Sequence, residues 1–298
     1  MSRLYTEISG SGPTLVLLHG WGLNVRVWDG LAAALRDRFR IIAVDLPGHG
    51  RSAWLPERSS LEEQAAQVHE TIAGIASDYS LLGWSLGGQI ALQLAAAQHA
   101  AGDRHAPLAA SLERLVLIAA TPRLVAAPDW PHGAPPERLT AQAAGLRTDY
   151  RRTVSDFLEL QVRGSAGGAE ALERLRAALF AHGDFAPATT SLPAETDAET
   201  GASESDRAGD RRPFLAALTR GLELLRDTDL RPLLPDVTLP TLVIAGQYDR
   251  VTMPAASHAL ADSLPNARYV EIRRAAHAPF LSHLPELSAL ISGFLLQP

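Results

Sequence analysis

The sequence of 298 residues predicts an α/β domain, built from a mostly parallel sheet with helices on both faces and an inserted helical cap. Three observations predict it. Short apolar runs alternate with helical patterns over the first 120 residues, the alternation stops between about 122 and 234, and it resumes near 241. We therefore expect one core formed by residues 1–121 and 235–298, interrupted by a cap at 122–234.

Six runs have the composition of strands that are buried on both faces, because they are rich in Leu, Ile and Val. They are 14–18, 40–44, 79–83, 115–119, 241–245 and 269–272. Helical spacing covers 27–35, 61–76, 89–97, 254–264 and 285–296. Ser59 and Ser60, followed by Glu62 and Glu63, predict an N-cap and an acidic first turn for the second of these helices.

The expected cap shows helical patterns at 138–146, 150–162, 169–180 and 214–225, and no convincing strand. Within it, residues 186–212 contain hardly any large apolar side chains and carry an excess of acids. Such a segment cannot bury enough apolar surface to offset its ordering entropy. We expect a flexible or disordered acidic loop there.

The composition excludes several classes of function. The chain has no cysteine, which rules out thiol chemistry and disulfides, and its net charge of −6 argues against a general nucleic-acid binder. No apolar run approaches the ~20 residues of a membrane span, and the N-terminus lacks the apolar core of a signal peptide. The histidines show no metal-ligand spacing. We expect a cytoplasmic monomer with no metal, no cofactor and no membrane or nucleic-acid partner.

The segment Gly83-Trp84-Ser85-Leu86-Gly87 joins a predicted strand to a predicted helix. A serine between two glycines at such a junction is the nucleophile elbow of an α/β-hydrolase fold. The sharp turn strains the serine backbone and leaves no room for side chains two positions before and after it. Ser85 is therefore the predicted nucleophile.

A serine nucleophile requires a base, and the base requires an acid that orients it. In α/β-hydrolases these residues follow in the order Ser, Asp or Glu, His, each after a strand. Asp249 follows the strand 241–245, and His277 follows the last strand. All three belong to the same edge of the sheet, which predicts a Ser85–His277–Asp249 triad. The alternatives for Asp249 and His277 are a surface turn acid and an ordinary exposed or core histidine.

The loop after the first buried strand reads His19-Gly20-Trp21-Gly22. An oxyanion hole needs two backbone N–H donors, and position assigns them to Leu86 and Trp21. The Trp21 indole is expected at the mouth of the pocket, unless it only packs there. A second Gly-rich loop, Asp45 to Ser52, lacks the residue order of a phosphate-binding loop, and we interpret it as a structural turn.

Five segments together resemble the pimeloyl-[acyl-carrier protein] methyl ester esterases, a family of α/β-hydrolases that acts in biotin synthesis. The segments are LLHGWGLN (17–24), VDLPGHGRS (44–52), GWSLGGQIA (83–91), RTV with FLELQ (152–161) and AAHAPFLSH (275–283). The first, third and fifth are common to the fold. The combination of HGWG, GWSLGG, FLELQ and AHAPF is more specific, and the similarity extends from about residue 14 to 290.

The resemblance implies hydrolysis of the methyl ester of a pimeloyl chain carried on acyl carrier protein, giving the free acid and methanol. It assigns Ser85, His277 and Asp249 to the triad. It also implies that the substrate is bound by Trp21, Ser85, Leu86, Phe157, Leu158, Glu159, Leu160, Gln161 and His277. The chain departs from the family in its acidic segment 186–212 and at Asp156, where the family tends to be basic.

The residues alone predict an aliphatic ester hydrolase and leave alternatives open. A short-chain carboxylesterase, a carbon-carbon bond hydrolase and a cofactor-free perhydrolase all use this fold and triad. An intact triad argues against a non-catalytic ligand receptor. A serine at the elbow, in place of aspartate, excludes a haloalkane dehalogenase.

Overall fold

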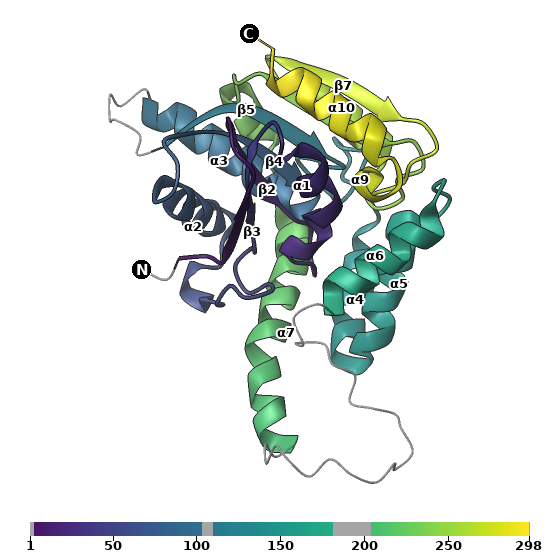
Figure 1. Cartoon of the computed structure of the whole chain (residues 1–298). Coiled ribbons are helices and arrows are strands. Elements are labelled where there is room, and N and C mark those ends of the chain that lie inside the picture. Colours follow the sequence, from purple (N-terminus) through teal and green to yellow (C-terminus); the bar gives the residue numbers. More distant parts are fainter. Residues whose placement is uncertain (1–2, 103–109, 181–203, 298) are drawn as a thin grey trace.

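The computed structural model describes residues 3–102, 110–180 and 204–297 (Figure 1). Within them a seven-stranded sheet has the order β1-β3-β2-β4-β5-β6-β7. Its strands are β1 (Thr6–Ser9), β2 (Thr14–Leu18), β3 (Arg40–Val44), β4 (Asp78–Trp84), β5 (Ser111–Ile118), β6 (Thr241–Gly246) and β7 (Ala267–Ile272). β1 runs antiparallel to β3, and all other pairs are parallel.

Helices cover both faces of the sheet (Figure 1). α1 (Asp29–Leu35) packs against α10 (Leu284–Leu295), and α2 (Leu61–Ala73) packs against α3 (Leu86–Gly102). The remaining helices are α4 (Pro136–Thr148), α5 (Tyr150–Val162), α6 (Gly168–Phe180), α7 (Glu204–Asp227), α8 (Pro254–Ser263) and α9 (Pro279–Ser282). This architecture confirms the predicted α/β-hydrolase fold class.

The strand register places the site. Leu18 on β2 pairs with Gly83 on β4, and Ile118 on β5 pairs with Ile244 on β6. The carboxyl ends of the parallel strands therefore share one edge of the sheet, which is where ligands bind in open α/β sheets. The sequence pattern did not predict β1, because this edge strand is partly exposed and lacks a continuous apolar run.

Ser60 caps α2, as its sequence position predicts, and its side chain accepts a hydrogen bond from the Glu63 N–H. Glu62 and Glu63 lie in the first turn of this helix, where their negative charges interact favourably with the positive end of the helix dipole. Polar N-cap chemistry at this position therefore fixes where α2 begins.

α4 to α7 follow β5 in the chain and precede β6, and they gather at one end of the sheet (Figure 1). α4 packs against both α5 and α7. Of the expected acidic loop, residues 186–203 lie outside the described residues. Residues 204–212 form the start of α7, so the expectation of a loop is wrong for them. Glu, Arg and Ala favour helix even without apolar neighbours, a propensity that an argument from apolar content overlooks.

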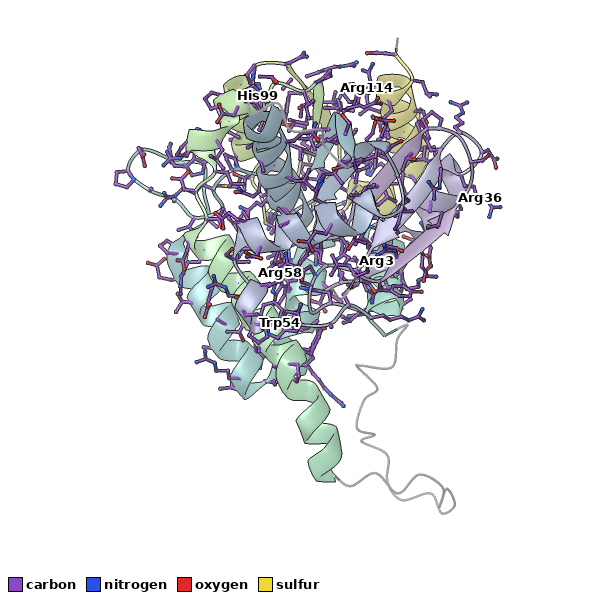
Figure 2. The ribbon with its side chains drawn as sticks, turned by 90° about the vertical axis from the view of Figure 1, so that its left-hand side faces the viewer. Arg3, Arg36, Trp54, Arg58, His99 and Arg114 are labelled. Atoms are coloured by element: carbon purple, nitrogen blue, oxygen red, sulfur yellow. The ribbon has the colours of Figure 1, made fainter. Side chains whose placement is uncertain are left out.

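The loop that carries Trp54 lies against α7 (Figure 2). A side chain at Gly48 would collide with Ala217 of α7, and the Arg220 guanidinium donates a hydrogen bond to the Ser59 carbonyl at 3.2 Å. On the core side of this contact, Arg58 forms ion pairs with Glu63 and Glu70. α7 is therefore attached to the core on the side away from β6 and β7.

Two searches of the described residues gave negative results. No helix among them is long and apolar enough to cross a membrane. In the same part of the chain, no group of three or more His, Asp or Glu side chains is arranged to hold a metal ion.

Candidate active site

Ser85 lies between β4 and α3 in a strained backbone conformation, with φ of 56°. Its N–H continues the sheet by donating to the Ile118 carbonyl at 3.1 Å. A Cβ at Gly83 would overlap the Gly87 carbonyl, and a Cβ at Gly87 would overlap the Leu18 carbonyl. Both glycines are thus required by close backbone approach, and they fix the serine at the carboxyl edge of the sheet.

Asp249 and His277 meet in the interior beside this edge. The distance between Asp249 Oδ2 and His277 Nδ1 is 2.8 Å, and both side chains are fully buried. The other oxygen, Oδ1, accepts from the N–H groups of Val251 and Thr252 at 2.8 and 3.0 Å. The carboxylate therefore holds the imidazole with Nδ1–H toward Asp249, which leaves Nε2 as an acceptor.

His277 Nε2 is buried and has no hydrogen-bond partner among the described residues. An unpaired buried acceptor is costly, and such groups concentrate where chemistry requires them. A base that is to take a proton from a serine needs this open nitrogen.

Two contacts hold the backbone of His277. Trp84 Nε1–H donates to its carbonyl at 2.9 Å, and the His277 N–H donates to the Gln161 carbonyl at 2.9 Å. The Trp84 ring also packs against the imidazole, with 5.5 Å between ring centroids. One contact comes from the elbow and the other from the end of α5, so both the core and the cap position this histidine. The sequence analysis did not identify Trp84, since the elbow motif leaves its residue type free.

The loop after β2 runs beside the serine. A methyl group at Gly20 would stand 3.3 Å from Ser85 Cβ. The backbone N–H groups of Trp21 and Leu86 donate to no acceptor within the described residues. Two such donors next to a serine are what an oxyanion hole provides.

The Trp21 indole connects this loop to the cap. Its Nε1–H donates to the Leu218 carbonyl of α7 at 2.8 Å, and its ring packs edge-on against Phe157 of α5 with 5.1 Å between centroids. At Gly221 an added Cβ would lie 2.7 Å from Trp21 Cδ1. The indole is buried in this contact, so α5 and α7 both approach the active-site loop through Trp21.

A small cavity of about 20 Å³ adjoins Ser85 between the sheet edge and the cap. Its apolar lining comes from Leu124, Leu139, Phe157, Leu222, Leu225 and Val251. Two polar cap residues, Arg138 and Gln142, also line it, and the sequence analysis did not assign either of them to the active site. Their one signal in the sequence is the i, i+4 spacing, which places them on one face of a predicted helix.

The segment 157–161 forms the second half of α5, and its residues face different directions. Phe157 lines the cavity, while Leu158 and Gln161 are buried. Glu159 points outward, where it pairs with Arg176 at 3.3 Å. Leu160 is partly buried. Five consecutive helical residues cannot share one face, because each turn contains 3.6 residues.

The loop from Asp45 to Ser52 holds the loop after β2, which carries Trp21, in place. The buried Asp45 carboxylate accepts from the N–H groups of Val25 and Arg51 at 2.7 and 2.9 Å. His19 Nε2 accepts from the Leu46 N–H at 3.0 Å. These bonds tie the loop after β3 to the loop after β2, in agreement with a structural turn.

Acid is expected to destabilise the fold through two buried histidines. Burial lowers the pKa of His19 from 6.5 to about 4 and that of His49 to about 3. Below pH 6.5 the unfolded chain binds protons that the folded protein does not. Stability is therefore retained above pH 6.5, and each histidine lowers it by up to about 1.4 kcal/mol per pH unit between pH 6.5 and its folded pKa.

Urea unfolding of His49→Asn, measured between pH 7 and 4.5, tests this expectation. The asparagine amide can replace His49 Nδ1 as donor to the Pro47 carbonyl, and it does not titrate. The variant should lose stability less steeply with acid than the parent. Substitution of the exposed Thr140, which does not titrate, by asparagine is the control and should keep the parental slope. Parallel curves for the parent and His49→Asn would contradict the assignment.

Residues 13–284 match a family model described as the alpha/beta hydrolase fold. The pimeloyl-[acyl-carrier protein] methyl ester esterase of Nitrosomonas europaea is 37% identical over 283 residues, which is 95% of each chain. The esterase of the same name from Stenotrophomonas maltophilia is 36% identical, covering 98% of this chain and 96% of that protein.

Solved structures agree on the fold. A hydrolase from Pseudomonas aeruginosa has a TM-score of 0.73 at 27% identity, covering 98% of this chain and 94% of that chain. An esterase from Exiguobacterium antarcticum has a TM-score of 0.76 at 20% identity, covering 99% and 96%. At 20% identity the second similarity shows the fold alone.

Proposed function

The chain belongs to the pimeloyl-[acyl-carrier protein] methyl ester esterases, a family with the α/β-hydrolase fold, and we propose that Ser85, His277 and Asp249 carry out its reaction. It is a carboxylic ester hydrolase. Its substrate is the methyl ester of pimeloyl-[acyl-carrier protein], and its products are pimeloyl-[acyl-carrier protein] and methanol, a step in biotin biosynthesis.

In the proposed mechanism, Ser85 Oγ attacks the ester carbonyl while His277 Nε2 takes its proton. Asp249 keeps the imidazole in the required tautomer and stabilises the imidazolium that forms. The N–H groups of Trp21 and Leu86 stabilise the oxyanion of the tetrahedral intermediate. Methanol leaves with the proton from His277. A water molecule, activated by the same nitrogen, then releases the acid and restores Ser85.

The observation that carries this proposal is the buried Asp249–His277 hydrogen bond, with an open Nε2, next to a strained serine that lines an apolar cavity. It is tested by comparing turnover of the pimeloyl-carrier methyl ester with that of short p-nitrophenyl esters. A higher kcat/KM for the carrier-bound ester is expected. Equal or better use of the short esters would favour a general short-chain carboxylesterase on the same triad.

Recognition of an acidic carrier protein by a chain of net charge −6 requires a local basic surface. We place it at Arg147, Arg151 and Arg152, which are exposed at the end of α4 and the start of α5 and are called here the arginine patch. Arg176 forms ion pairs with Glu159 and Glu173, which offset its charge, so it contributes less to this basic surface. Asp156 lies 3.8 Å from Arg152 and reduces the charge of the patch.

Reversing two charges of the arginine patch, in Arg151→Glu with Arg152→Glu, is expected to raise KM for the carrier-bound ester. Hydrolysis of a small free ester should change little, because both side chains are exposed and do not line the Ser85 cavity. The difference between the two substrates should shrink with added salt, which screens exposed charges. Steady-state kinetics at two ionic strengths measure it.

Asp156→Ala provides the opposite change and should lower KM for the carrier-bound ester, since it frees Arg152. Equal losses on both substrates in the double variant would indicate a damaged cap. No loss on either substrate would remove the arginine patch from the proposal.

The proposal includes a monomer in the cytoplasm. Size-exclusion chromatography with light scattering tests the oligomeric state.

A further inference from the structure

The cap contributes a cation to the cavity that contains the nucleophile. Arg138 on α4 lines this cavity together with Ser85, and its guanidinium is partly buried. It donates one hydrogen bond, from Nη1 to the Arg250 carbonyl at 2.7 Å. Among the described residues no carboxylate lies within 4 Å of it, so the charge has no direct counterion. A guanidinium that is partly withdrawn from water without a counterion is unfavourable unless something else pairs with it.

The pKa of Arg138 reflects its partly buried position. Desolvation lowers the pKa of the Arg138 guanidinium, and the negative charge of Asp249 opposes that shift. Asp249 does not pair directly with Arg138, because its two oxygens already accept hydrogen bonds from His277, Val251 and Thr252. Arg138 remains protonated, as arginine does in proteins, and retains donors that the Arg250 carbonyl does not use.

Gln142 lies one turn further along α4 and lines the same cavity. Its Nε2 is buried and has no hydrogen-bond partner within the described part of the chain. Residues four apart on a helix share a face, so the two side chains approach the cavity from one side. The remaining lining is apolar, apart from the Ser85 hydroxyl. The cavity thus offers one buried, unpaired amide donor from Gln142 and a guanidinium with further N–H groups from Arg138, and its lining residues include no carboxylate.

We propose that Arg138 and Gln142 form a carboxylate-binding subsite that receives the acid released by ester hydrolysis. The inference rests on the proposed function, because that reaction creates a carboxylate at Ser85, which lines this cavity. Water adds to the acyl carbon, and the bond between this carbon and Ser85 Oγ breaks. One proton of the water returns to the serine through His277, and the acid loses the other to solvent and remains as a carboxylate. A bidentate guanidinium contact with an added amide N–H suits this anion and not the neutral ester.

The subsite predicts that the enzyme binds carboxylates in preference to neutral molecules of the same shape. Heptanoate and heptanamide are suitable probes, since both have seven carbons and differ in charge at one end. Calorimetric titration of the full chain measures their affinities without relying on turnover. Heptanoate should bind at least tenfold more tightly than heptanamide, which corresponds to ~1.4 kcal/mol. Added salt should reduce the preference.

Arg138→Met should abolish this preference, and Gln142→Met should weaken heptanoate binding at least threefold. Both substitutions keep an unbranched side chain of similar length on α4. Arg163→Met is the control, because Arg163 is exposed at the end of α5 and does not line the cavity. Its heptanoate affinity should equal that of the parent. Arg138→Lys retains the charge, so it should keep part of the preference even if Arg138→Met folds poorly.

The source of the carboxylate is tested with monomethyl and dimethyl heptanedioate as substrates. If the subsite receives the newly formed acid, Arg138→Met changes KM for both esters by the same factor and weakens product inhibition. A selective rise in KM for the half ester would show that a second carboxylate on the substrate binds there, and would overturn the product assignment.

Equal affinities of the parent for heptanoate and heptanamide would overturn the subsite, as would an unchanged preference in Arg138→Met. These titrations need no carrier protein. Failure of the subsite is therefore distinguishable from failure of the proposed function, which would appear as no turnover of the carrier-bound ester.

Discussion

Replacement of Ser85 by alanine is expected to abolish ester hydrolysis, with kcat reduced about 10⁴-fold or more. The hydroxyl oxygen is the proposed nucleophile, and no other side chain in the cavity lining can replace it. The fold should be retained, because Ser85 Oγ makes no hydrogen bond within the described residues. Alanine keeps the Cβ, so the backbone strain at φ of 56° is unchanged.

Turnover of a short ester by the purified variant, together with urea unfolding, measures both parts of this expectation. The matched control is Ser288→Ala, a partly exposed serine on α10 far from the elbow in sequence, which should keep parental activity. Activity of Ser85→Ala within tenfold of the parent would refute the assignment. Loss of activity together with loss of cooperative unfolding would leave the nucleophile to be identified by covalent trapping of Ser85 in the parent.

The sequence predicted those elements whose composition is determined by burial. β2 and β3 have the bounds expected from their apolar runs, and so does α5 from its helical spacing. Ser60 and Glu63 located the start of α2. The pattern failed where burial is one-sided, as in β1, whose Ile8 is half exposed on the sheet edge. It also failed at the start of α7, where helix propensity acts without apolar spacing.

The candidate site likewise contains residues that local sequence patterns indicate and residues that they do not. Ser85, Asp249 and His277 could be proposed as a triad from sequence because strand ends and chain order constrain them. The residues around them depend on how the cap folds over the sheet edge, which no local pattern specifies. Arg138 is a helical arginine with a common spacing, and only packing of α4 against α5 and α7 brings it into the cavity. Glu159 shows the converse, because a contiguous motif suggested five substrate contacts and the helix turns this residue outward.

Asp249→Asn is expected to lower kcat about 10³- to 10⁴-fold with little change in geometry, because the variant holds His277 in the wrong tautomer. The direction follows from the hydrogen bonds at the carboxylate. Oδ1 accepts from two backbone N–H groups, those of Val251 and Thr252. In the variant the amide oxygen must take this position, since an NH₂ group there would face two donors.

The asparagine NH₂ then faces His277 Nδ1 and donates to it, which forces the proton of the neutral imidazole onto Nε2. A protonated Nε2 cannot accept the proton of Ser85, so the base is lost although every heavy atom stays in place. Steady-state kinetics should show the loss in kcat with KM changed less than threefold, and thermal unfolding should remain cooperative. Asp262→Asn, at an exposed position on α8, is the control and should retain parental kinetics. Near-normal turnover by Asp249→Asn would mean that another acid orients His277, and would remove Asp249 from the mechanism.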